Sequence, residues 1–119
     1  MSLTLAEMRA AAEASRRTVE VSIVEFGGTV LLKQLDAVTG LRIGAMCNAE
    51  NGQPLDAQRM ADYFVAVLTG SIVDDAGVLQ CDNDEGQAFL RALPVNILTV
   101  LADEAVKLNG MGGEAAKKN

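Results

Sequence analysis

Five acidic side chains lie close together in the second half of the sequence, and carboxylates at this density could bind a cation. They are Asp74, Asp75, Asp82, Asp84 and Glu85. An EF-hand calcium loop needs oxygen ligands at alternate positions, a glycine at the sixth position and a glutamate at the twelfth. No register of this segment supplies that set. Acidic residues in such places commonly form turns and cap helices, so we expect those roles here and no metal site.

The residue types required for most other chemistry are absent or isolated. The chain has no histidine, which is the commonest general base and the commonest metal ligand. Cys47 and Cys81 are far apart and belong to no Cys-x-x-Cys pair. We expect both thiols to be reduced and buried as small hydrophobic side chains. No nucleophile is paired with a base, so we expect a binding protein rather than an enzyme, with no catalytic residue and no cofactor.

Length and charge exclude further classes of protein. A chain of 119 residues fits one domain, and half of its residues are hydrophobic but only 3% are aromatic, which predicts an aliphatic core. The net charge of -6 would repel a nucleic acid backbone. The longest apolar run, near 63–68, is too short to span a bilayer, and charged residues interrupt the N-terminus where a signal peptide would be apolar. We expect a cytoplasmic protein that binds neither nucleic acid nor membrane.

The hydrophobic pattern predicts an α+β fold, with an N-terminal helix and a β-hairpin packed on a small helical domain. Thr4 and Glu7 have the spacing of a capping box for a helix over 5–16. That helix has little to bury, so we expect residues 1–17 to form a separate, loosely docked segment. Residues 18–110 would form a single domain. Residues 111–119 are rich in glycine and lysine and are expected to be a flexible tail.

The hairpin is expected over 18–35, where two extended runs flank Gly27 and Gly28. Glycines at both central positions suit a two-residue turn, which would place Ile23 opposite Leu32. One face would then be apolar and pack on the helices, with Val19, Val21, Ile23, Val30 and Leu32. The other face would be mixed and would include Val24, Phe26 and Leu31.

Three helices are expected after the hairpin, at about 56–69, 84–93 and 95–109, because apolar residues recur there at helical spacing. Asp56 would cap the first, and Pro94 would separate the second from the third. Residues 71–80 carry a turn at 74–77 between short apolar runs, which suggests a second hairpin. The segment 36–51 is ambiguous, because Gly40 and Gly44 weaken its helical pattern.

The order of these elements resembles the tail assembly chaperones of long-tailed bacteriophages and their prophage relatives. The resemblance covers roughly 18–113 and rests on an ordered set of short motifs. They are the hairpin Val24-Glu25-Phe26-Gly27-Gly28-Thr29-Val30, the turn Val73-Asp74-Asp75-Ala76-Gly77, and the ending Ala105-Val106-Lys107-Leu108-Asn109-Gly110-Met111-Gly112. Phe26 stands where that family usually has tryptophan, and 36–51 lacks the charge-rich helix often found there.

The resemblance implies a non-catalytic role in the host cytoplasm. Members of the family bind the long helical tape measure protein, keep it soluble until tail tube subunits replace them, and are absent from the mature virion. The candidate contacts on this chain are Val24, Phe26, Leu31 and Met111. The resemblance also implies a frameshifted longer product, because Lys117-Lys118-Asn119 can be encoded by a slippery heptamer.

Two alternatives to these expectations stay open. One is a small structural subunit of the virion, either a tail subunit or a head-completion subunit. Another is an acidic regulator that binds a basic partner. Unprotected hairpin edges also suggest association with a second copy of the chain.

Overall fold

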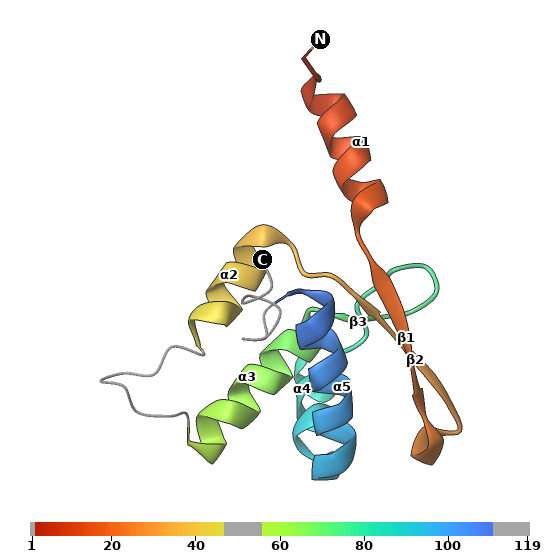
Figure 1. Ribbon diagram of the computed structural model, residues 1–119. Helices are drawn as coiled ribbons and strands as arrows, with labels where there is room; N and C mark the ends of the chain where they lie inside the picture. The colour runs from red at the N-terminus through yellow and green to blue at the C-terminus, as the bar shows by residue number, and fades with distance from the viewer. Residues whose placement is uncertain (1, 47–55, 111–119) are drawn as a thin grey trace.

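The computed structural model describes residues 2–46 and 56–110 (Figure 1). These ranges form five α-helices and a three-stranded sheet. The elements in order are α1 (Leu5–Ser15), β1 (Thr18–Ile23), the 3-10 turn η1 (Val24–Phe26), β2 (Gly28–Lys33), α2 (Ala37–Ala45), α3 (Ala57–Thr69), β3 (Ile72–Val73), α4 (Asp84–Arg91) and α5 (Val95–Leu108). The architecture is α+β with an N-terminal helix, as the sequence predicts. The predicted tail, 111–119, lies outside the described residues.

The sheet has the order β1-β2-β3, and both pairings are antiparallel. β1 and β2 form the predicted hairpin, but the predicted register is wrong. Ile23 pairs with Gly28, and Val19 pairs with Leu32. The loop therefore contains four residues, Val24 to Gly27, rather than two glycines.

The sequence of the loop explains this difference. Residues 24–26 form a single 3-10 turn, which Gly27 ends at φ 71° with its N–H donating to the carbonyls of Val24 and Ile23. Only Gly27 needs the left-handed conformation that glycine adopts without strain, and Gly28 is the first residue of β2. The faces of the hairpin were nevertheless predicted correctly. Val21, Ile23 and Leu32 are buried, and Val19 and Val30 pack partly against the core.

The core lies between the sheet and the helices α3, α4 and α5. α5 packs against α3 and against both long strands, and α4 packs on α3. The largest side chains with almost no exposure are Leu32, Leu68, Leu90 and Leu101. The core is therefore aliphatic, as the composition predicts.

Short polar side chains set where the helices begin. The Asp56 carboxylate accepts the N–H of Arg59 at 2.8 Å and so caps α3. Pro94 precedes α5. α4 is capped by Asn83, whose side-chain oxygen accepts the N–H of Gly86 at 2.7 Å. In the ambiguous segment, α2 forms in spite of its two glycines, and Asp36 caps it by accepting the N–H of Thr39 at 2.7 Å.

The predicted second hairpin is present as a short irregular one. Val73 and Leu79 form an isolated bridge around the turn at 74–77, and Ile72 pairs with Leu32. This third strand flanks β2, so the hairpin does not stand as an isolated two-stranded ribbon.

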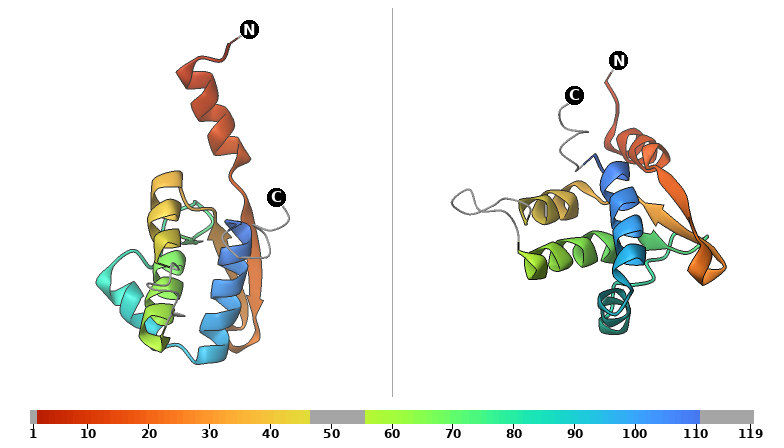
Figure 2. Two further views of the ribbon diagram at one scale, coloured as in Figure 1. Left: turned by 60° about the vertical axis from the view of Figure 1, so that its left-hand side comes forward. Right: turned by 60° about the horizontal axis from the view of Figure 1, so that its bottom comes forward.

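α1 differs from the other helices because none of its residues is buried. The predicted capping box is formed: the Thr4 N–H donates to the Glu7 carboxylate at 2.9 Å, and the Glu7 N–H donates to Thr4 Oγ1 at 3.2 Å. The helix extends away from the rest of the molecule, as two further views show (Figure 2).

Candidate functional site

An exposed apolar surface lies where the tip of the hairpin meets the junction of α4 and α5. It consists of Val24 (90% exposed), Phe26 (43%), Phe89 (48%) and Val95 (77%), and we call it the tip patch. The rings of Phe26 and Phe89 lie with their centroids 6.3 Å apart and their planes at 39°. Tilted aromatic pairs at this separation attract each other, so this contact ties the hairpin tip to α4.

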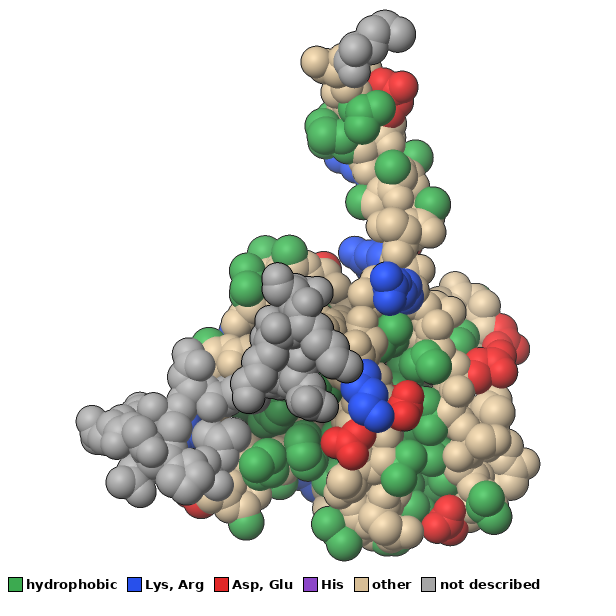
Figure 3. Space-filling model, in the orientation of Figure 1, with side chains coloured by type: hydrophobic (Ala, Val, Ile, Leu, Met, Phe, Trp, Pro, Cys, Tyr) green, Lys and Arg blue, Asp and Glu red, His purple; other side chains and the backbone are tan. Residues whose placement is uncertain are grey.

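A second contact holds the tip against α5. The side-chain amide of Asn96 donates to the Glu25 carboxylate at 3.3 Å. Glu25 and the acidic first turn of α4, Asp84 and Glu85, place negative charge around the tip patch. The space-filling view shows acidic side chains next to apolar ones at this end of the molecule (Figure 3). The surface is thus suited to an apolar partner whose flanking residues are polar or basic.

The structure separates the residues that the sequence proposed as partner contacts. Val24 and Phe26 lie together in the tip patch. Leu31 lies on the middle strand, half-buried, opposite Val73 of β3 and Glu20 of β1. Met111 lies outside the described residues.

Two residues of the tip patch, Phe89 and Val95, were missed by the sequence reasoning. A signal was available for Phe89: Leu90 and Leu93 fall on the inner face of their segment, which turns Phe89 toward the surface. Its pairing with Phe26, 63 positions earlier, is a tertiary contact that local patterns do not reveal.

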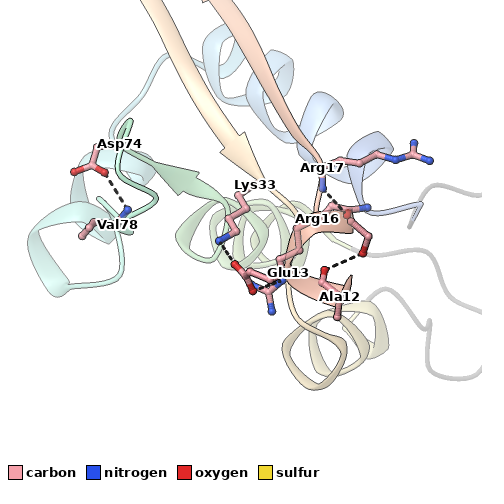
Figure 4. A network of polar contacts seen from close by, with 9 residues as sticks. Ala12, Glu13, Arg16, Arg17, Lys33, Asp74 and Val78 are labelled. Atoms are coloured by element: carbon pink, nitrogen blue, oxygen red, sulfur yellow. Dashed lines mark hydrogen bonds and ion pairs between the residues drawn. The ribbon is translucent and has the colours of Figure 1, made fainter. Parts of the chain in front are cut away.

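Three residues of the acidic cluster in the second half of the chain, Asp74, Asp84 and Glu85, have structural roles. The Asp74 carboxylate accepts the N–H groups of Ala76 at 2.9 Å and Val78 at 3.0 Å, which closes the turn (Figure 4). Asp84 and Glu85 lie in the first turn of α4, where negative charge is favourable. Within 2–46 and 56–110, no three Cys, Asp or Glu side chains gather as a metal site would require.

Cys81 is a free, buried thiol. Burial raises the pKa of this thiol, and the neighbouring Asp82 carboxylate raises it further, so the side chain is held in its unreactive protonated form. The Cys47 prediction falls outside the described residues.

A shallow groove of about 670 Å³ lies between α2 and the end of α5. We call it the α2 groove. Most of its lining is apolar, and much of it consists of small residues; the lining residues are Leu35, Asp36, Ala37, Gly40, Leu41, Gly44, Ala45, Asn109 and Gly110.

Among the described helices, none has both the length and the apolar character to cross a membrane.

The fold is similar to that of a bacteriophage tail assembly chaperone of known structure. That solved structure is the tail assembly chaperone of bacteriophage HK97, which the chain matches with a TM-score of 0.61 and 20% sequence identity. The match covers 90% of this chain and 98% of that one. No family model matches the sequence, and no curated protein matches it. The likeness therefore concerns the fold, and it includes nearly the whole of the HK97 chain.

Proposed function

We propose that the chain is a tail assembly chaperone of a phage or prophage. It would bind the tape measure protein and keep it soluble in the host cytoplasm while the tail assembles, without catalysing a reaction. The tip patch is the observation that carries this proposal: it is an exposed apolar surface on an acidic protein whose fold is similar to that of a solved tail assembly chaperone.

The tip patch has the properties that are needed to keep a long amphipathic helix soluble. A long amphipathic helix that exposes an apolar stripe self-associates in water, and an acidic protein that covers the stripe turns charge outward and opposes aggregation. Full burial of a valine or phenylalanine side chain contributes about 1.5–3 kcal/mol. The four side chains of the tip patch are already partly covered, so each chaperone would contribute less than that sum. Several copies could then hold one helix, and assembling subunits could still displace them.

We propose Val24, Phe26, Phe89 and Val95 as the contact residues. Met111 stays a prediction from the sequence. Leu31 also stays a prediction, but we leave it out of the test variants because its loss would weaken the pairing with Val73 within the sheet.

The test is co-expression with the tape measure protein, followed by affinity purification of the chaperone. The test variant carries Val24→Ser and Val95→Ser, because these side chains are the most exposed in the tip patch and their loss should not disturb the core. The matched control carries Val78→Ser and Val100→Ser, which remove two exposed valines outside the tip patch (57% and 46% exposed). We expect the test variant to lose the soluble complex and the control to retain it.

Equal recovery of tape measure protein with both variants would contradict the proposed site. Failure of the unaltered chain to recover or solubilise the tape measure protein would contradict the proposed function. Purified virions provide a second criterion, because a chaperone should be absent from them. A fixed copy number in virions would instead establish a structural subunit of the tail or head.

A further inference from the structure

The end of α5 is fixed beside the start of α2 by side-chain hydrogen bonds. The Asn109 side-chain oxygen accepts the Leu35 N–H at 2.7 Å, and its amide group donates to the Ala105 carbonyl at 2.8 Å. The Gln34 side chain donates to the Leu108 carbonyl at 2.9 Å. Because these bonds join the segment before α2 to the last turn of α5, the chain leaves α5 at a fixed position beside the α2 groove (Figures 1 and 2).

The backbone at the end of α5 has the geometry that turns a chain back toward its helix. Gly110 has a φ of 65°, and its N–H donates to the Lys107 carbonyl at 3.1 Å. This is one of the two hydrogen bonds of a Schellman cap, in which an apolar residue directly after the glycine often packs back against the last helical turns. The residue at that position is Met111. Its expected contact on α5 is Val106, which itself packs partly against the core.

The α2 groove lies within reach of Met111. Gly110 is one of the residues that line the groove, and the Cα atoms of consecutive residues lie about 3.8 Å apart. Leu41, which also lines the groove, is 76% exposed, so apolar surface is available there. A methionine side chain is unbranched and fills irregular gaps well. Residues 112 and 113 are glycines, which let a backbone pass close to small lining residues such as those of α2.

We propose that residues 111–113 dock in the α2 groove of their own chain, with the Met111 side chain between α2 and the last turn of α5. The tether identifies this occupant. A segment attached one residue away has an effective concentration in the millimolar range, with which any separate protein would have to compete. α2 packs on α3, and the docked segment would attach it to α5 as well.

The inference does not depend on the proposed function, because it concerns a contact of the chain with itself. It does bear on one predicted partner contact. If Met111 lies in the groove of the free chain, it can touch a partner only after the segment has left the groove.

The first test is NMR spectroscopy of the unaltered full chain with labelled methyl groups. We expect nuclear Overhauser effects from the Met111 methyl group to the methyl groups of Leu41 and Val106. When labelled chains are diluted into a large excess of unlabelled chains, these effects should keep their strength per labelled chain. Their absence would overturn the proposal. Their loss on dilution would overturn it too, since the groove would then hold a segment of another copy.

The second test is a double-mutant cycle, with stability measured as the urea midpoint of the full chain. Met111→Ser and Leu41→Ser should each lower the midpoint, and the double variant should lose less than the sum of the two losses, because both remove the same contact. Met111→Leu should keep most of the midpoint of the unaltered chain.

Val38→Ser supplies the matched control for this cycle. Val38 lies on α2, is 75% exposed and is not among the residues that line the groove. Its loss should add to that of Met111→Ser without coupling. Additive losses for Met111 and Leu41, or equal coupling of Met111 to Leu41 and to Val38, would show that the segment does not occupy the groove.

Discussion

Replacement of Gly86 by alanine should destabilise the protein, although the same replacement usually stabilises a helix. Gly86 lies in the first turn of α4, where alanine would contribute at most about 1 kcal/mol through its higher helix propensity. A Cβ atom at this position would lie 2.4 Å from the Cα atom of Cys81 and 2.9 Å from its carbonyl carbon. Favourable carbon–carbon contacts begin near 3.5 Å, so α4 and the segment at Cys81 would have to separate by about 1 Å.

The expected magnitude follows from these two opposing effects. Overpacking of a well-filled site costs about 1–3 kcal/mol, and the atoms in the way belong to backbone, which cannot rotate aside. Allowing for the gain in helix propensity, we expect Gly86→Ala to lower the free energy of unfolding by about 1–2 kcal/mol. Cys81→Ala should not rescue the variant, because the two closest atoms remain.

The measurement is urea unfolding followed by circular dichroism, with the midpoint compared at constant m-value. Gly28→Ala is the matched control. A Cβ atom at Gly28 would meet no other atom within 4 Å, and the variant should be at least as stable as the unaltered chain because alanine restricts the unfolded state. If Gly86→Ala is as stable as Gly28→Ala, the packing of α4 against Cys81 is not as described.

Three further outcomes follow from the structure. Leu90→Ala, at a side chain with no exposure, should lower the free energy of unfolding by about 2–5 kcal/mol in the same urea assay; a loss below about 1 kcal/mol would show that the site is not a packed core. Hydrogen bonds from the side chain and the backbone N–H of Thr39 hold the pKa of Asp36 below its ordinary 3.8. A lowered folded-state pKa stabilises the fold above the unfolded pKa, and this contribution is lost as the pH falls through the folded value. The difference in stability between the unaltered chain and Asp36→Asn should therefore be largest near neutral pH and shrink below 3.8, whereas a constant difference would exclude an effect of the charge. Cys81 should resist alkylation in the native protein and react in denaturant, as peptide mapping by mass spectrometry would show; fast native labelling would mean that the thiol is accessible.

The hairpin shows what the sequence could and could not determine. Alternation of apolar residues correctly assigned the buried face, but the turn was placed two residues too late in the sequence on the basis of its glycines. The error did not exchange the two faces of the hairpin. Ile23 pairs with Gly28 instead of the predicted Leu32, so the register is shifted by an even number of residues. An even change keeps each side chain on its own face of the sheet.

Helix starts were predictable for a different reason. Capping by Thr4 and Asp56 and the break at Pro94 depend on residues within one turn of the helix, so a local pattern identifies them. α2 could not be assigned with equal ease, because its contacts with α3, which are tertiary, offset the low helix propensity of Gly40 and Gly44.

The candidate site was predicted only in part. The sequence of the hairpin identified Val24 and Phe26 as candidate contacts. The partner of Phe26 within the fold, however, depends on how α4 and α5 pack against the hairpin. Phe89 and Asn96 reach the hairpin tip from more than 60 positions away. Packing at this separation in sequence is set by the whole core and not by any local signal.

The contacts at the end of α5 bear on how the chain acquires its fold during synthesis. The Gln34 side chain donates to the carbonyl of Leu108 at 2.9 Å, and the Leu35 N–H donates to the Asn109 side chain at 2.7 Å, across 74 positions in each case. α5 also covers both long strands. A nascent chain lacking its last fifteen to twenty described residues would leave the inner face of the hairpin uncovered. The ribosome must therefore release the chain through the end of α5 before the sheet can be enclosed, and termination before α5 would yield an aggregation-prone fragment.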